Sequence, residues 1–106
     1  MKEFSAIQLH NFLKDNECEP LLLDVREEWE FDRCNIAGSV LIPMSQIPGE
    51  LDELDPDRVI VVICHHGIRS RHIGIYLESE GFENIINLSG GVEAWARDID
   101  PNMAVY

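Results

Sequence analysis

Five consecutive β-branched residues at positions 59–63 constrain the fold more than any other feature of the sequence. The run Val-Ile-Val-Val-Ile shows no alternation of polar and apolar side chains, which is typical of a strand buried on both faces. Strands of this kind lie in parallel sheets, where helices cover both sides. The sequence therefore predicts an α/β fold in which a central, mostly parallel sheet is flanked by helices.

The other segments alternate between strand-like and helix-like patterns. Ser5 and Gln8 have the spacing of a capping box, which predicts a helix that begins near residue 6. Gly81 predicts the end of a later helix. Further strands are expected at residues 21–25, 40–42 and 85–88, and helices at residues 6–15, 27–32, 45–54, 70–79 and 92–97, the third of them short or interrupted at Pro48 and Gly49.

Length and charge limit the classes of function. The 106 residues fit one domain over residues 1–106, with a core at about residues 5–97 and a C-terminal tail at residues 98–106 that lacks periodicity. The formal net charge is -12, from 20 acidic residues against 8 Lys and Arg. A field of this sign repels phosphate backbones and anionic lipid surfaces, which argues against nucleic-acid and membrane partners. The oligomeric state stays open between a monomer and a weak dimer.

The three cysteines are Cys18, Cys34 and Cys64, and this odd number argues against a closed set of disulfides. Glu3 stands where a secretory signal peptide would be basic. No apolar run approaches the roughly 20 residues that span a bilayer. We therefore expect a cytoplasmic protein with reduced thiols, in which Cys18 and Cys34 are inert or merely exposed.

A cluster of reactive and cationic residues directly follows the central strand. It holds three of the four histidines and two of the eight Lys and Arg residues. Ligands of parallel α/β sheets bind beyond the carboxyl ends of the strands, so this position favours a binding site. The cluster predicts a locally positive site on a negative body, and its members are Cys64, His65, His66, Gly67, Ile68, Arg69, Ser70, Arg71 and His72.

A tight loop between a strand and a helix favours a reactive thiol at Cys64. Converging backbone N–H groups form an anion nest, and the following helix adds its unpaired N–H groups and the positive end of its dipole. Cationic Arg69, and a protonated His65 or His66, would add to this field. Such surroundings stabilise the thiolate, which is the nucleophilic form of a cysteine. Gly67 leaves room for a ligand to approach the backbone.

Four segments of the sequence, in order, resemble the rhodanese family. The run from Cys64 to Ser70 is similar to the family's active-site loop, a cysteine followed by x-x-Gly-x-Arg-Ser. Residues 24–31 are similar to its Asp-Val-Arg segment and the acidic-aromatic stretch after it. Residues 35–43 are similar to its Gly-His-Ile-x-Gly-Ala and Ile-Pro segment, and residues 88–95 match its C-terminal Gly-Gly signature. One departure is Cys34-Asn35, where the family usually has Gly-His, and that segment is mainly structural.

The resemblance implies a single-domain rhodanese fold, with three layers, and a sulfurtransferase that works by double displacement. Cys64 would take the outer sulfur of a small anionic donor such as thiosulfate and hold it as a persulfide. An acceptor would then remove that sulfur. Cyanide serves as acceptor in assays, and thiols or partner proteins are the expected cellular acceptors.

The resemblance also implies roles for individual residues. The loop from His65 to Ser70 would bind the persulfide and the donor, with Arg69 orienting an oxyanion and Ser70 capping the helix. Asp24 and Arg26 are expected to support the site as a structural ion pair. No cofactor is expected. A metal at Cys64 and its neighbouring histidines is disfavoured, because adjacent residues rarely converge on one ion without distortion.

Other interpretations remain open at this point. Cysteine phosphatases and arsenate reductases also use a cysteine, an anion loop and an arginine, but the phosphatases have Cys-x5-Arg, whereas Cys64 and Arg69 form Cys-x4-Arg. A non-catalytic binding module or a sulfur-relay carrier is the second alternative. Cys34 as a resolving thiol for Cys64 has weak support. Trp29 and Trp95 are assigned to the core.

Overall fold

The central strand of the sheet is β4 (Ile60–Ile63), whose four residues are all buried. It pairs in parallel with β2 (Leu21–Asp24) on one side and with β5 (Ile85–Leu88) on the other. The outer strands are β3 (Val40–Leu41) and β1 (Lys2–Phe4), so that the order is β1-β5-β4-β2-β3 with every pair parallel. The computed structural model describes residues 1–15 and 19–106, and Cys18 lies outside the described residues.

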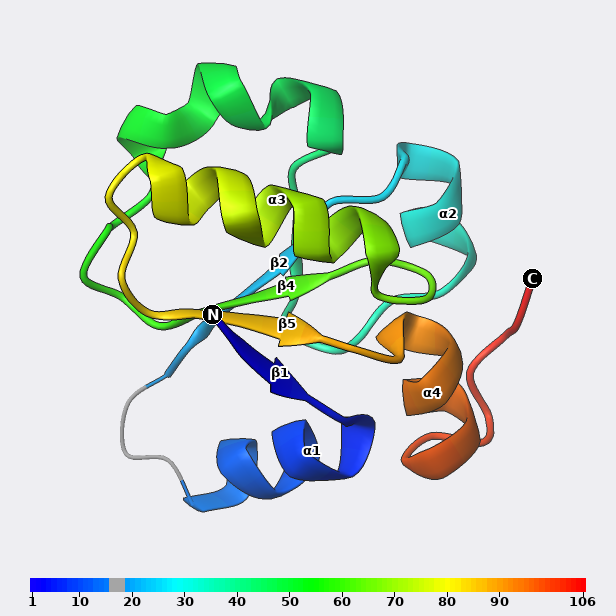
Figure 1. Ribbon diagram of the computed structural model, residues 1–106. Coiled ribbons are helices and arrows are strands. Elements are labelled where there is room, and N and C mark those ends of the chain that lie inside the picture. Colours follow the sequence, from blue (N-terminus) through cyan, green and yellow to red (C-terminus); the bar gives the residue numbers. More distant parts are fainter. Residues whose placement is uncertain (16–18) are drawn as a thin grey trace.

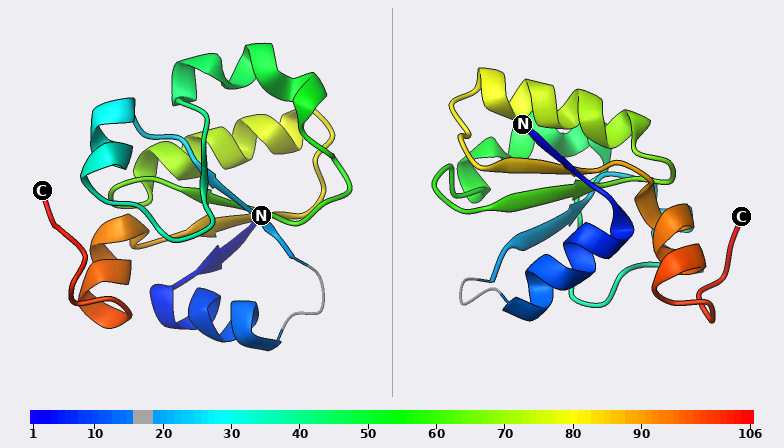
Figure 2. Two further views of the ribbon diagram at one scale, coloured as in Figure 1. Left: turned by 180° about the vertical axis from the view of Figure 1, so that it is seen from behind. Right: turned by 60° about the horizontal axis from the view of Figure 1, so that its bottom comes forward.

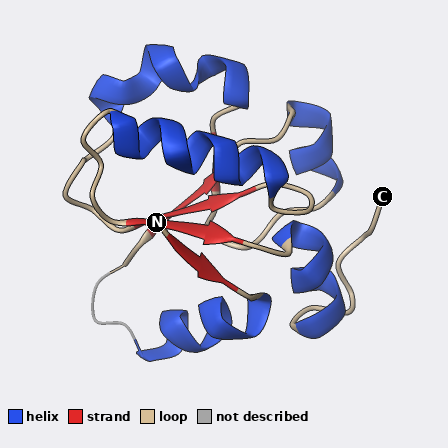
Figure 3. Ribbon diagram, viewed as in Figure 1, coloured by secondary structure: helices blue, strands red, loops and turns tan. Residues whose placement is uncertain are grey.

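Helices cover both faces of this sheet and give three layers (Figure 3). One face carries α3 (Ile68–Ser79) and the 3-10 helix η1 (Met44–Glu53). The other face carries α1 (Ala6–Asp15) and α4 (Gly91–Asp98), while α2 (Glu28–Arg33) lies near the carboxyl ends of the strands (Figures 1 and 2). The expected α/β fold with a central parallel sheet is confirmed.

Alternation along β4 explains why the core has two halves. Val61 and Ile63 pack with α1 and α4, whereas Ile60 and Val62 pack with α3 and η1. Side chains of a strand point alternately to opposite faces, so a strand covered on both sides must be apolar throughout. The β-branched run therefore identified the middle of the sheet correctly.

Most predicted elements lie within two residues of the observed ones. The Ser5 capping box is present, because Gln8 N donates to Ser5 Oγ at 3.1 Å and Ser5 N donates to Gln8 Oε1 at 2.8 Å. Pro48 lies inside η1, which is 3-10 rather than α-helical. The sequence reading missed β1, because this edge strand has three residues and two of them are charged.

The two tryptophans differ in burial. Trp95 is buried in the core, as expected, but Trp29 is 61% exposed. Its indole meets the ring of Tyr106 edge-on, with centroids 5.6 Å apart. The assignment of Trp29 to the core was therefore wrong, because α2 turns this side chain away from the sheet. Among the described residues, no helix is both long and apolar enough to cross a lipid bilayer.

Candidate active site

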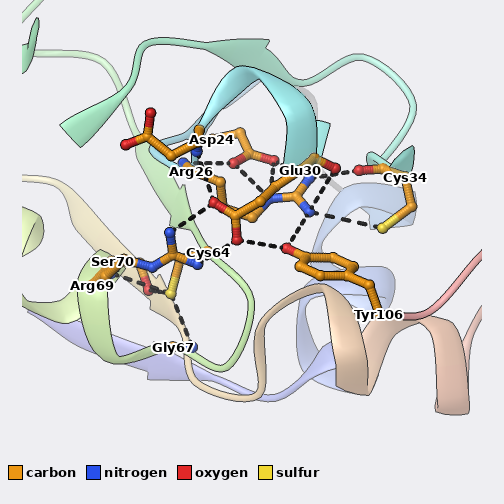
Figure 4. Close-up of polar contacts among 10 residues, drawn as sticks. Asp24, Arg26, Glu30, Cys34, Cys64, Gly67, Arg69, Ser70 and Tyr106 are labelled. Carbon is orange, nitrogen blue, oxygen red and sulfur yellow. Dashed lines mark hydrogen bonds and ion pairs between the residues drawn. The ribbon is translucent and has the colours of Figure 1, made fainter. Parts of the chain in front are cut away.

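Cys64 directly follows β4, and its side chain is buried with only 1% exposed. Its Sγ accepts the backbone N–H of Gly67 at 3.1 Å and that of Ser70 at 3.3 Å (Figure 4). The Ser70 hydroxyl oxygen also lies 3.3 Å from the sulfur. Three groups of the loop and the following helix thus surround the sulfur, and two of them are N–H donors suited to a thiolate.

Further N–H groups of the loop are free to bind a ligand. Within the described part of the chain, the N–H groups of His66, Ile68 and Arg69 make no hydrogen bond to the backbone. Ile68 and Arg69 begin α3, where the first N–H groups of a helix have no partner inside the helix. The arrangement can therefore hold negative charge on the sulfur and on an atom attached to it.

The loop after β5 and the first turn of α4 hold the backbone of the cysteine loop. Val92 N donates to Cys64 O at 3.0 Å, and Glu93 N donates to His65 O at 3.2 Å. These bonds draw the loop carbonyls toward α4. Gly67 has φ +96°, and a Cβ on it would stand 2.1 Å from Ser89 O, so the two loops approach backbone to backbone. Only glycine fits both the angle and the space.

Ser70 does not cap α3. The helix begins two residues earlier, at Ile68, after Gly67, and no side chain caps it. Instead the buried Ser70 hydroxyl donates to Asn87 Oδ1 in β5. Asn87 Nδ2 in turn donates to Gly67 O at 3.1 Å and to Glu3 Oε1 at 2.8 Å. The expected cap was wrong, although Ser70 does hold the loop to the sheet.

Arg69 points from α3 toward α2, where it forms a bidentate ion pair with Glu30 (Figure 4). Both N···O distances are 2.8 Å. The Arg69 guanidinium lowers the pKa of Glu30 to about 2. Glu30 also accepts the Tyr106 hydroxyl at 3.0 Å and Glu27 N at 2.8 Å. The predicted role of Arg69 in orienting an oxyanion stays a prediction, and in this structure its guanidinium faces a carboxylate.

Arg26 and Asp24 form the buried pair that the sequence predicted to be structural. Both side chains are fully buried, and Arg26 donates to Asp24 Oδ2 at 2.7 Å. The same guanidinium donates to Cys34 O at 2.6 Å and to the Tyr106 hydroxyl at 2.8 Å. It therefore ties β2 to the segment after α2 and to the C-terminal tail.

His65 and His66 stack on each other, with ring centroids 3.9 Å apart, and His65 also stacks on Tyr106 at 4.0 Å. Burial and the neighbouring His66 lower the pKa of His65. His66 Nε2 lies 3.1 Å from Glu93 Oε2. These two imidazoles and Glu93 have ligand atoms within 4.8 Å of one another, but the rings are nearly parallel, so one must rotate before both bind one ion. His72 is exposed on α3.

The expected net positive site is not what the folded chain presents. Arg69 is paired with Glu30, and Arg71 is paired with Glu3 at 3.0 Å. Both carboxylates come from segments distant in the sequence, 39 and 68 residues away. Charge counted within the cluster could not include them, so it overestimated the local positive charge.

A small pocket opens at the sulfur. It has a volume of about 260 Å³ and is lined by Cys64, His65, His66, Ile68 and Arg69. Cys34 does not line it, because its thiol is buried in the half of the core that faces α1 and α4. The position of Cys34 gives no support to a resolving role.

Sequence reasoning missed three residues that shape the site: Glu30, Asn87 and Tyr106. Glu30 had one signal, since a charged residue between Trp29 and Phe31 in a short amphipathic helix must either be solvated or find a partner. Asn87 is the only polar residue of β5, a further signal that it has a partner. Tyr106 lies in a tail without periodicity, and nothing in the sequence indicated its role.

Comparison with known proteins places the chain in a family. The Rhodanese-like domain model matches residues 5–98. The Bacillus subtilis (strain 168) protein YtwF is 37% identical over 101 residues, which are 95% of this chain and 96% of that protein. A protein of Allochromatium vinosum named Sulfurtransferase is 35% identical over 97 residues, covering 92% of this chain and 90% of that protein.

Longer relatives and solved structures also match the chain. The chain is 30% identical to the Rhodanese-like/PpiC domain-containing protein 12, chloroplastic, of Arabidopsis thaliana, and spans 38% of its length. The crystal structure of a Rhodanese-like Domain Protein from Staphylococcus aureus superposes with a TM-score of 0.85 at 29% identity, over 100% of this chain and 99% of that one. The cysteine loop at the end of β4 and these matches lead to one conclusion: the chain belongs to the rhodanese-like domain family.

Proposed function

We propose that this protein is a sulfurtransferase that carries sulfane sulfur on Cys64. In the first half-reaction the Cys64 thiolate attacks the outer sulfur of the donor, and a new S–S bond forms at Sγ. The bond between the two donor sulfurs breaks, and its electron pair leaves with the donor's remaining part. In the second half-reaction an acceptor attacks the outer sulfur of the persulfide, and the Cys64 thiolate is released. No external oxidant or reductant enters either step.

One observation carries this proposal: the buried Cys64 Sγ accepts two backbone N–H groups at 3.1 and 3.3 Å. A thiolate needs such donors when water cannot reach it. Among the described residues, the N–H groups of His66 in the loop and of Ile68 and Arg69 at the start of α3 have no backbone partner, and we expect them to bind the outer sulfur of a persulfide. The relatives named as sulfurtransferases support the same chemistry.

The donor class is a small molecule with a sulfane sulfur, for which thiosulfate is the assay reagent. The acceptor class is a thiol, free or on a partner protein, because a thiolate attacks the outer sulfur without further catalytic groups. The pocket of about 260 Å³ admits a side chain or a small molecule rather than a folded surface. A partner protein would therefore have to present its thiol on a protruding segment.

Thiocyanate formation from a sulfane donor and cyanide tests the proposal. Cys64→Ser should abolish turnover while the chain stays folded, because a serine oxygen still accepts the N–H groups of Gly67 and Ser70. Cys34→Ser is the matched control, since this buried thiol lies outside the pocket, and it should retain turnover. Turnover that survives in Cys64→Ser, with circular dichroism showing a folded chain, would overturn the proposal.

A further inference from the structure

Both arginines that follow the cysteine loop have an acidic partner. Arg69 pairs with Glu30 at 2.8 Å, and Arg71 pairs with Glu3 at 3.0 Å. His66 lies 3.1 Å from a Glu93 carboxylate oxygen. Within the described part of the chain, the side chains around the sulfur therefore carry no net positive charge. The whole chain has a formal charge of -12, so the long-range field repels anions.

Glu30 is the partner that bears on chemistry, because Arg69 lines the same pocket as Cys64. The Glu30 side chain is 5% exposed, whereas that of Arg69 is 36% exposed. Glu30 also accepts the Tyr106 hydroxyl and Glu27 N, which hold its carboxylate in place. Two of the five N–H groups of Arg69 are bonded to Glu30, so a substrate oxyanion at the pocket would meet a guanidinium whose positive charge Glu30 already balances.

We propose that Glu30 is a specificity-determining residue, which neutralises Arg69 and so selects uncharged or weakly charged organic persulfides over dianionic thiosulfate as donors. This inference rests on the sulfur transfer proposed above and narrows its donor class. Glu30 acts through Arg69 and touches no substrate atom itself.

The charges that meet in the first half-reaction, with each of the two donors, show why this selection follows. With thiosulfate, the Cys64 thiolate and the dianion bring three negative charges together, and they leave as the persulfide anion and sulfite. With a protonated persulfide R–S–SH, one negative charge enters; the thiolate takes the outer SH group, and the electron pair of the broken S–S bond leaves on RS⁻. The backbone N–H groups carry only partial charges, and without a free cation they balance one negative charge more fully than three.

The pocket rim also fits an organic donor. Ile68 lines the pocket and is 62% exposed as a residue. An apolar rim can pack against the carbon atoms of an organic persulfide, but it makes no favourable contact with the charged oxygen atoms of thiosulfate. The imidazole of His65, whose pKa is lowered by burial, is not a substitute cation.

The test compares kcat/KM for thiosulfate and for cysteine persulfide, whose carrier group has no net charge at neutral pH. Glu30→Gln keeps a hydrogen bond to Arg69 but frees its charge, and should raise kcat/KM for thiosulfate about tenfold while that for cysteine persulfide changes less than about twofold. Glu28→Gln is the matched control, because it removes the same charge from an exposed position of α2. It should move neither value by more than about twofold.

A second variant shows whether Arg69 transmits the effect. In Glu30→Gln/Arg69→Met the neutral pair is restored, so the gain with thiosulfate should disappear. The inference is overturned if Glu30→Gln fails to raise the thiosulfate value, if it raises both donors equally, or if the gain persists without Arg69.

Salt dependence of the wild type gives an independent result that needs no variant. Because repulsion dominates, kcat/KM for thiosulfate should rise between about 20 and 200 mM salt, and that for cysteine persulfide should stay flat. A fall for thiosulfate would show an attractive cationic site and overturn the inference. If cysteine persulfide loads Cys64 but the donor ratio does not respond to Glu30, only this inference fails. If neither donor loads Cys64, the proposed function fails as well.

Discussion

Arg26 and Arg69 both pair with carboxylates near the cysteine loop, but they differ in burial and in the sequence distance to their partners. Arg26 and Asp24 are both fully buried and are two residues apart in the sequence. Arg69 is 36% exposed, and its partner Glu30 is 39 residues away. The first guanidinium makes bonds to several segments, whereas the second bonds one carboxylate at the pocket. The burial of the guanidinium thus distinguishes the pair that holds the fold from the pair proposed to set the charge of the site.

The largest difference is expected when each arginine is truncated. Arg26→Met leaves the buried Asp24 carboxylate without its cation, and should lower the free energy of unfolding by about 3–5 kcal/mol. Arg69→Met should cost only about 1–2 kcal/mol, because Glu30 keeps the Tyr106 hydroxyl and Glu27 N as donors. Urea denaturation measures both values. Equal losses for the two variants would break the distinction between the pairs.

A smaller effect on the free energy of unfolding is expected when the pH is lowered. The pKa of Glu30 is lowered by Arg69 from 4.5 to about 2. A carboxylate with a lowered pKa adds stability that is present above its unfolded value and is lost as the pH falls through its folded value. The wild type should therefore exceed Glu30→Gln in free energy of unfolding at neutral pH, and the gap should close between pH 4.5 and pH 2. A gap that is constant over this range would contradict the ion pair.

The smallest effect on the free energy of unfolding is expected from Tyr106→Phe. The hydroxyl accepts from Arg26 at 2.8 Å and donates to Glu30 at 3.0 Å, so it joins the two pairs. Its removal should cost about 1 kcal/mol in unfolding experiments. The ring stays, and its stack on His65 should persist. A cost near zero would show that the two arginine pairs are independent of the tail.

The buried strands of the sheet and the position of the cysteine loop were predictable, because both depend on neighbours in the sequence, whereas the charged edge strand β1 was not. A β-branched run specifies a strand buried on two faces, and Cys64 with Gly67 and Arg69 specifies the loop that follows it. Helix α1 was predicted with both its ends correct, because a capping box marks its start and an apolar stripe marks its length.

The charge of the site was not predictable in the same way. It depends on Glu30 and Glu3, which the fold brings to Arg69 and Arg71 from other elements. The spacing of residues within the loop gives no information on the carboxylates that tertiary structure brings next to these two arginines. The predicted burial of Trp29 was wrong for a related reason, because only the orientation of α2 decides which side of this short helix faces the solvent.

The most direct test of sulfur transfer through Cys64 is the intact mass of the protein after incubation with cysteine persulfide, and separately with thiosulfate, followed by cyanide. The wild type should gain one sulfur, about 32 mass units, with at least the persulfide, and should lose it to cyanide, while Cys64→Ser gains nothing. A wild type that gains no sulfur from either donor, or a Cys64→Ser variant that gains it equally, would contradict the assignment of Cys64 as the sulfur carrier.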